Sequence, residues 1–170
     1  KAEAEALAII ATKADGGMRD ALSLFDRIAR FSEGNITYAN TIENLNILDY
    51  DYYFRLTDFF LQGDYRSVLI VLDELLAKGF DGQVIVSGLA SFFRDLMMAQ
   101  DASTLPLLEQ SEVVIQRYVD MAARCPTSFL YQSLKILNAC DQQYRQSNGK
   151  RLLLELSLMN IAALFSKGLT

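Results

Sequence analysis

One stretch of the sequence decides the fold that we expect for this chain: Asp15-Gly16-Gly17-Met18-Arg19-Asp20-Ala21-Leu22-Ser23-Leu24-Phe25-Asp26. A glycine turn here opens directly into an amphipathic helix. Gly17 can serve as the N-cap, which places Met18, Arg19 and Asp20 in the first helical turn. Asp20 then sits where a carboxylate can turn back to the free backbone N–H groups, as in a capping box. The stretch therefore predicts a helix that begins at Met18.

The apolar residues of this helix recur at the i, i+3, i+4, i+7 spacing of a stripe that faces a protein core. The stripe comprises Met18, Ala21, Leu22, Phe25, Ile28 and Ala29. The pattern predicts that Leu22 and Phe25 point inward. Arg19 and Asp26 lie off the stripe, where they can reach another surface.

Arg19 is the strongest candidate for a functional residue. The helix dipole places partial positive charge at the N-terminus, so a cation in the first turn is mildly unfavourable. An arginine set against this preference usually has an anion to meet, and bare N–H groups beside a guanidinium form a phosphate-binding corner. The competing interpretation is a solvated surface arginine that pairs with a neighbouring acid. The short motif alone does not decide between the two.

A longer match surrounds this motif. The run from Glu5 to Ala11, followed by Ala14 to Asp26, resembles the lid region of AAA+ clamp loaders, most closely the gamma/tau subunit family of bacterial DNA polymerase III. The resemblance implies that this is the sensor 2 segment, in which Arg19 would reach the terminal phosphate of ATP. Gly17 and Asp20 would then support the helix start. Gly17 departs from the serine expected there, although glycine caps a helix nearly as well.

The resemblance continues more loosely through the rest of the chain. Residues 46–49 correspond to the passage from lid to collar, and residues 148–155 to the start of the last collar helix. The sequence contains no Gly-x-x-x-x-Gly-Lys-Ser/Thr phosphate loop, no acidic strand end for magnesium and no cysteine cluster for the zinc module of the family. The resemblance thus implies a fragment, whose parent would bind ATP and Mg²⁺ through a domain upstream of Lys1. We expect no catalytic residue, enzyme activity or cofactor in the isolated chain.

The composition favours long helices. At 170 residues the chain can form one small domain beside a medium one, and it has only two prolines and nine glycines. No convincing period-two run bounded by hairpin turns is present. We therefore predict an all-α fold, with a three-helix AAA+ lid over residues 1–47 and a helical collar, an oligomerisation domain, over residues 48–170.

Charge and rare residues exclude several functions. A net charge of −5 argues against direct DNA binding, because an acidic surface does not attract a polyanion. There is no histidine, and Cys125 and Cys140 are too few for a zinc site, so we expect no metal ligands. Both cysteines are expected to be small apolar residues in a reduced, cytoplasmic protein. The most apolar segment, residues 152–165, is shorter than the roughly 20 residues of a membrane span, which argues against membrane insertion.

Local signals place the remaining helices. In the first part of the chain we expect helices over residues 2–14 and 18–31 and a short one after a cap at Thr37. Three more are expected: one after caps at Asp49 and Asp51, one over residues 65–78 with a stop at Gly79, and one from a cap at Asp81 to residue 100. The last three are expected over residues 111–124, from residue 127 or 128 onward, and over residues 150–166. Residues 101–109 are expected to form a surface loop.

Two sets of apolar residues can be interpreted as part of the core or as part of an interface with a partner. The last helix is apolar around nearly its whole circumference, so it must be covered on all sides. The other collar helices can enclose it, or a neighbouring subunit can cover one side, and both can hold if the helix lies in the core and reaches the interface at one end. The cluster Tyr50, Tyr52, Tyr53 and Phe54 predicts one or two exposed rings at a partner contact, with the others in the core.

Three classes of function remain for comparison. The first is the lid and collar of a clamp-loader subunit, which would bind other clamp-loader subunits in homo- and hetero-oligomers and meet the sliding clamp and primed DNA only through the intact complex. The second is the same pair of domains in another replication or recombination ATPase, or a helical interaction module. The third is a small helical catalyst that uses Asp95, Glu109 and Asp141, although no defined spacing brings two of these carboxylates together.

Overall fold

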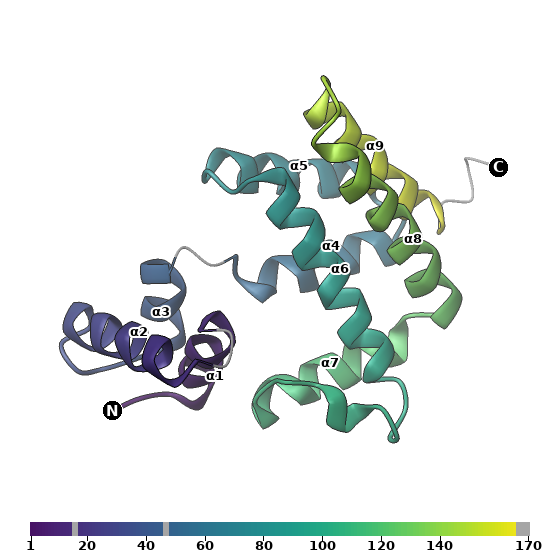
Figure 1. Cartoon of the computed structure of the whole chain (residues 1–170). Coiled ribbons are helices and arrows are strands. Elements are labelled where there is room, and N and C mark those ends of the chain that lie inside the picture. Colours follow the sequence, from purple (N-terminus) through teal and green to yellow (C-terminus); the bar gives the residue numbers. More distant parts are fainter. Residues whose placement is uncertain (15–16, 46–47, 166–170) are drawn as a thin grey trace. The chain divides into compact units, whose positions relative to one another are not determined.

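The computed structural model describes residues 1–14, 17–45 and 48–165, and these residues are almost entirely helical (Figure 1). The helices are α1 (Ala4–Lys13), α2 (Met18–Phe31), α3 (Tyr38–Leu45), α4 (Tyr50–Leu61), α5 (Tyr65–Ala77), α6 (Gly82–Met98), α7 (Glu112–Arg124), α8 (Thr127–Tyr144) and α9 (Lys150–Ala163), with a 3₁₀ turn at Leu105–Leu107. Within the described ranges the only β pairing is an isolated bridge, so the predicted all-α class is confirmed.

The chain divides into two compact units. One comprises Lys1–Ile47 with Pro106–Arg117, and the other comprises Leu48–Leu105 with Tyr118–Thr170. The assignment of residues 1–47 to a lid and 48–170 to a collar stays a prediction.

The first unit contains the three-helix group α1, α2 and α3. Its core is formed by buried apolar side chains, with further half-buried ones packed against them: Ala6, Ile10, Ile28, Ile36 and Leu45, then Ile9, Leu24, Phe25 and Ala29. Thr37 caps α3 as predicted, because its Oγ1 accepts a hydrogen bond of 3.2 Å from the Asn40 N–H. The Asn40 side chain in turn accepts one of 2.9 Å from the Thr37 N–H. This is a reciprocal cap.

The first helix begins at Ala4, and the prediction that it starts at residue 2 was wrong. Residues 1–3 are extended beside Ile36, which donates a hydrogen bond of 2.8 Å to the Lys1 carbonyl and accepts one of 2.9 Å from the Glu3 N–H. The Glu3 carboxylate also accepts a 2.7 Å hydrogen bond from the Tyr38 N–H at the start of α3. These contacts between segments distant in sequence outweigh the local helical preference of the alanine-rich start.

In the second unit, α4, α5 and α6 begin at aspartate caps. Asp49 accepts a hydrogen bond of 2.9 Å from the Asp51 N–H, and Asp81 accepts one of 2.7 Å from the Gln83 N–H, as predicted. Asp64 caps α5 through the Ser67 N–H at 3.1 Å. Gly79 follows the end of α5 with φ +89°, the left-handed conformation in which glycine is favoured. Local sequence signals therefore set these helix ends.

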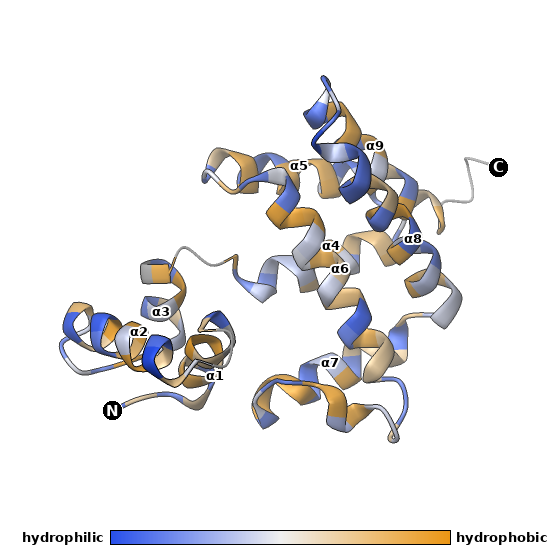
Figure 2. Ribbon diagram, viewed as in Figure 1, coloured by the Kyte–Doolittle hydropathy of each residue, from blue (hydrophilic) through white to orange (hydrophobic). Residues whose placement is uncertain are grey.

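The core of this unit joins helices from across its sequence. Helix α8 packs along α6, α9 packs against α5 and α8, and apolar residues recur along α5 and α6 (Figure 2). Tyr53 and Phe54 are buried, and Phe54 lies 4.8 Å from Phe92 and 5.3 Å from Tyr118 between ring centroids. Tyr50 and Tyr52 are half-buried. The aromatic run of α4 is thus divided between core and surface, as expected from helical geometry.

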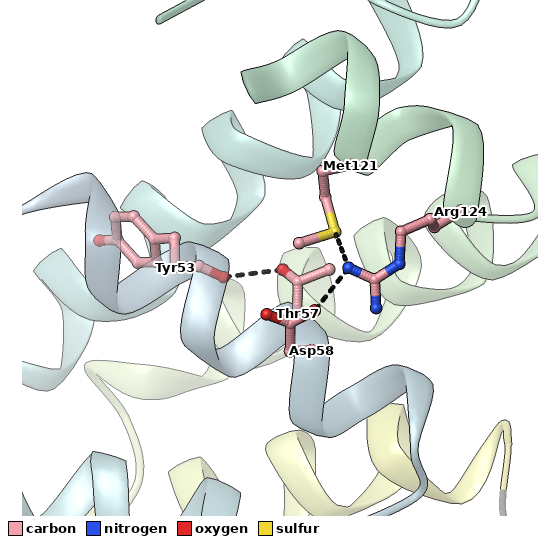
Figure 3. A network of polar contacts seen from close by, with 5 residues as sticks. All are labelled: Tyr53, Thr57, Asp58, Met121 and Arg124. Carbon is pink, nitrogen blue, oxygen red and sulfur yellow. Dashed lines mark hydrogen bonds and ion pairs between the residues drawn. The ribbon is translucent and has the colours of Figure 1, made fainter. Parts of the chain in front are cut away.

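Polar contacts join α4 to the end of α7 (Figure 3). The Arg124 guanidinium donates a hydrogen bond of 2.8 Å to the Asp58 carboxylate, and it lies 4.0 Å from the sulfur of Met121. The buried Thr57 hydroxyl donates to the Tyr53 carbonyl at 2.8 Å, one turn back along α4. The ion pair is half-exposed, so it contributes no more than about 1 kcal/mol to the free energy of unfolding.

The last helix, α9, is not enclosed on all sides. Leu154, Leu158 and Ile161 are buried, whereas Leu152 and Leu156 are 60% and 47% exposed. Helices α4, α5, α6 and α8 all contact α9, so the helix lies in the core of its unit on one side, as one interpretation expected, and exposes Leu152 and Leu156 on the other. No helix in the described ranges is both long enough and apolar enough to cross a membrane.

Ser133→Ala is expected to raise the free energy of unfolding by about 1 kcal/mol. Ser133 on α8 is fully buried, and its hydroxyl has no hydrogen-bond partner in the described part of the chain. Removing this unsatisfied group removes its desolvation cost, and alanine also favours the helix. Urea denaturation of the chain measures the change. Ser157→Ala is the matched control, because the buried Ser157 hydroxyl donates to the Leu153 carbonyl at 2.8 Å and should give no gain. A loss of stability in Ser133→Ala would mean that its hydroxyl is satisfied.

Candidate functional site

The candidate site lies at the first turn of α2, which begins at Met18 as predicted. Gly17 is the N-cap, with an extended backbone at φ −78° and ψ 116°, and its carbonyl accepts the first helical hydrogen bond from the Ala21 N–H at 2.9 Å. The N–H groups of the first turn point along the helix axis beyond its N-terminus, where the helix itself has no carbonyl to accept their hydrogen bonds. Such a turn can bind an anion.

Arg19 is exposed at this turn. Its guanidinium makes no ion pair or hydrogen bond to any residue within the described ranges. The competing interpretation, an arginine neutralised by a neighbouring acid, therefore has no support among these residues. Asp15 and Gly16, which precede the helix, lie outside the described residues. An exposed guanidinium beside first-turn N–H groups is a donor set that fits a phosphate group.

Asp20 turns back toward the N-cap. A Cβ atom placed on Gly17 would lie 3.3 Å from the Asp20 carboxylate oxygen Oδ2 and 3.4 Å from the Ala14 carbonyl oxygen. The Gly17 N–H itself donates to that carbonyl at 3.1 Å. Glycine thus leaves room for the chain and the carboxylate to approach each other closely. The roles of Gly17 and Asp20 as supports of the helix start stay predictions, as does the role of Arg19.

The apolar flank of Arg19 differs from the prediction. Met18 is 75% exposed and Leu22 is 57% exposed, so the expectation that Leu22 points inward was wrong. The buried face of α2 is centred on Ile28, and Leu24 and Phe25 pack against the core that contains it, so the inward orientation predicted for Phe25 is confirmed. Periodicity identified an apolar stripe wider than the surface that α1 and α3 cover. The exposed side of that stripe lies next to Arg19.

The other chemical candidates are held in structural roles. Cys125 and Cys140 are buried as expected, and burial raises the pKa of the Cys125 thiol to about 11 and that of Cys140 above its ordinary value. Neither is therefore an activated nucleophile. Asp95 contacts Arg94 at 3.3 Å, and Asp141 accepts a 3.3 Å hydrogen bond from Gln83. These separate partners give the hypothesis of a carboxylate catalyst no support.

Two family models match consecutive parts of the chain. Residues 1–34 match the ATPase lid domain of the DNA polymerase III clamp loader subunit, and residues 36–168 match domain III of DNA polymerase III subunits gamma and tau.

Curated relatives are also named as subunits tau and gamma of DNA polymerase III. The chain is 28% identical to DNA polymerase III subunit tau of Bacillus subtilis over 159 residues, which cover 94% of this chain and 28% of the relative. It is 35% identical to DNA polymerase III subunit gamma of Buchnera aphidicola from Schizaphis graminum over 94 residues, which cover 55% of this chain and 26% of that relative. The chain thus spans about a quarter of the length of these relatives.

The fold is shared with a solved clamp-loader protein. The Bacillus subtilis DNA clamp loader delta protein matches with a TM-score of 0.60 over 91% of this chain and 49% of the other, at 16% sequence identity. At this identity the likeness concerns the fold alone.

Proposed function

The chain belongs to the family of DNA polymerase III gamma and tau subunits, as the ATPase lid and domain III of a clamp-loader subunit, and from this premise we propose that it couples the nucleotide state of its parent to the assembly of a clamp-loader ring. The observation that carries the proposal is the order of the two matches, lid first and domain III directly after it, over nearly the whole chain. This order favours the clamp loader over another replication or recombination ATPase.

The lid supplies the nucleotide sensor. The parent subunit is an ATPase in this proposal, and its ATP, bound with Mg²⁺, provides the negative charge of the terminal phosphate. Arg19 donates to that phosphate when the lid closes, because it projects from the first turn of α2 with no partner among the described residues. Gly17 and Asp20 hold the turn. The isolated chain has no phosphate loop in its sequence, and it does not act as an enzyme on its own.

Domain III supplies the subunit contacts. Its partners are other clamp-loader subunits, and through the assembled complex it serves the sliding clamp and primed DNA in the cytoplasm. The surface that supports this part of the proposal is the outward face of α9, where Leu152, Leu156, Met159 and Ala163 follow one another at spacings of three and four residues. Leu152 and Leu156 are exposed, and Met159 and Ala163 are half-exposed. An apolar stripe of this kind fits a helix of a neighbouring collar.

Leu156→Asp is expected to abolish association of the chain with the other clamp-loader subunits. A carboxylate at the middle of the stripe would be buried without a partner in the assembled collar, whereas in the free chain this position is 47% exposed and the carboxylate can reach solvent. Mixing the chain with purified delta subunit, followed by gel filtration with light scattering, measures the association. Val84→Asp on α6 is the matched control, because Val84 is 50% exposed and lies on another helix.

The expected result is assembly of the wild type and of Val84→Asp, but not of Leu156→Asp, with equal urea midpoints for all three. Assembly of Leu156→Asp at wild-type affinity would show that the α9 face is not the contact. A wild-type chain that binds no clamp-loader subunit would contradict the proposed role of domain III.

A further inference from the structure

One asparagine of the second unit lies in an exposed loop and is followed by a glycine. Asn148 and Gly149 connect α8, which ends at Tyr144, to α9, which begins at Lys150. No other asparagine of the sequence precedes a glycine. The Asn148 side chain is exposed and has no partner in the part of the chain that the structure describes. Its amide group is therefore free to approach its own backbone.

The backbone nitrogen that follows Asn148 is also outside the helical hydrogen bonds. The Gly149 N–H donates to the Ser147 hydroxyl at 3.1 Å, so breaking this bond opens no helical turn. The first hydrogen bond of α9 uses the Gly149 carbonyl, which accepts from the Leu153 N–H at 3.0 Å. Glycine has no Cβ atom to shield its nitrogen. A nucleophile and an amide carbon that it can attack therefore lie side by side in this loop.

We propose that Asn148 is a site of spontaneous deamidation. The Gly149 nitrogen attacks Cγ of Asn148, a C–N bond forms, and the bond from Cγ to the side-chain amino group breaks. That amino group takes up the Gly149 amide proton and leaves as ammonia. Water then opens the cyclic imide. Attack of water at Cγ gives aspartate, and attack at the main-chain carbonyl carbon gives isoaspartate, in which the backbone runs through Cγ.

The charges around the loop favour the acidic products. The Lys150 ammonium donates at 2.9 Å to the carbonyl of Ser147, in the peptide bond that precedes Asn148. Arg145 is exposed at the end of α8. Helix α9 begins at Gly149 without a side-chain cap. A carboxylate at residue 148 thus meets two cations and the positive end of a helix, whereas the neutral amide gains little from them.

The modification changes the start of α9. Both products place a negative charge one residue before the helix cap, and isoaspartate also lengthens the backbone there by one methylene group. Leu152, the first residue of the outward apolar face of α9, follows Asn148 by four residues. Deamidation therefore alters the charge beside the proposed subunit contact. The inference itself depends only on the loop and stands whether or not that contact is correct.

Incubation of the 170-residue chain at neutral pH and physiological temperature, followed by peptide mapping with mass spectrometry, measures amide loss at each asparagine. Conversion at Asn148 should be at least about tenfold faster than at Asn138, because Asn138 is exposed but the nitrogen after it lies inside α8. Labelling with an isoaspartate methyltransferase should detect isoaspartate at residue 148, which forms only through the cyclic imide. Aspartate as the sole product would overturn the proposal, as would equal rates at the two asparagines.

Gly149→Ala is the matched variant. An added Cβ atom would meet nothing closer than the Leu152 Cβ at 3.9 Å, so the fold should be retained. Deamidation of Asn148 should slow at least about tenfold, because the methyl group shields the attacking nitrogen. An unchanged rate would mean that this nitrogen is not the nucleophile. A wild-type rate that rises more than about tenfold in guanidinium chloride would show that the folded loop protects Asn148, which also contradicts the proposal.

Discussion

Gly88→Ala is expected to lower the free energy of unfolding by about 3 kcal/mol, although glycine-to-alanine changes inside a helix normally add about 1 kcal/mol of stability. Gly88 lies in the middle of α6, against the ring of Tyr53 from α4. A Cβ atom at this position would overlap the Tyr53 hydroxyl and lie 2.7 Å from its Cζ atom. The expected effect therefore has the opposite sign to the helix-propensity effect.

The Tyr53 ring is buried against its neighbours. It stacks on Phe92 with 5.8 Å between ring centroids, and it is only 6% exposed. Burial also raises the pKa of the Tyr53 phenol well above its ordinary value, in keeping with a hydroxyl removed from water. The added methyl group must then displace α4 or α6, and such overpacking is costly in a close-packed core.

Urea denaturation of Gly88→Ala, Tyr53→Phe and the double variant tests this contact. Tyr53→Phe alone should lower the free energy of unfolding only slightly, because the hydroxyl lies 3.5 Å from the Ile85 carbonyl, at the limit of a hydrogen bond. The double variant should recover part of the free energy of unfolding that Gly88→Ala loses, since the clashing hydroxyl oxygen is gone while the Cζ atom remains. Ser87→Ala, at an exposed neighbouring position, is the control for helix propensity. If Gly88→Ala is as stable as Ser87→Ala, the close approach of α4 and α6 is wrong.

Much of this fold follows from local sequence signals. The start of α2 at Met18, the caps at Asp49 and Asp81 and the stop at Gly79 were all predicted, because each depends on residues within one helical turn. The start of the first helix was not, because residues 1–3 pair with Ile36, which lies far along the chain. Contacts between distant segments leave no local pattern to read.

The exposure of apolar residues near the site could not be predicted from the sequence for the same reason. The periodicity of α2 identified an apolar stripe, but it could not tell how much of that stripe two small neighbouring helices would cover, and Leu22 stayed exposed. The apolar circumference of α9 likewise did not reveal that Leu152 and Leu156 face solvent. The close approach of Gly88 to Tyr53 had no signal in the sequence. In each case the missing information is which residues meet across the fold.

Arg19→Ala is expected to weaken ATP binding by the parent subunit roughly 10- to 100-fold. A charge-assisted hydrogen bond between a guanidinium and a phosphate is worth about 1.5–3 kcal/mol, and this range corresponds to that loss of affinity. The substitution should not unfold the lid, because the Arg19 side chain is exposed and has no partner among the described residues. It also removes a cation from the positive end of a helix, which slightly favours α2.

Arg30→Ala is the matched control for this substitution. Arg30 is an exposed arginine of the same helix, placed in its last turn. Its removal changes the net charge by the same amount as Arg19→Ala, so any general electrostatic effect on ATP binding appears in both variants. A specific contact with the terminal phosphate appears only in Arg19→Ala.

The dissociation constant for ATP, measured by calorimetric titration of the wild-type parent subunit, Arg19→Ala and Arg30→Ala, tests the coupling of this lid to nucleotide most directly. We expect Arg30→Ala to bind ATP like the wild type and Arg19→Ala to bind it roughly 10- to 100-fold more weakly, with equal unfolding midpoints for all three. Wild-type affinity in Arg19→Ala would contradict the account and leave Arg19 as a solvated surface residue.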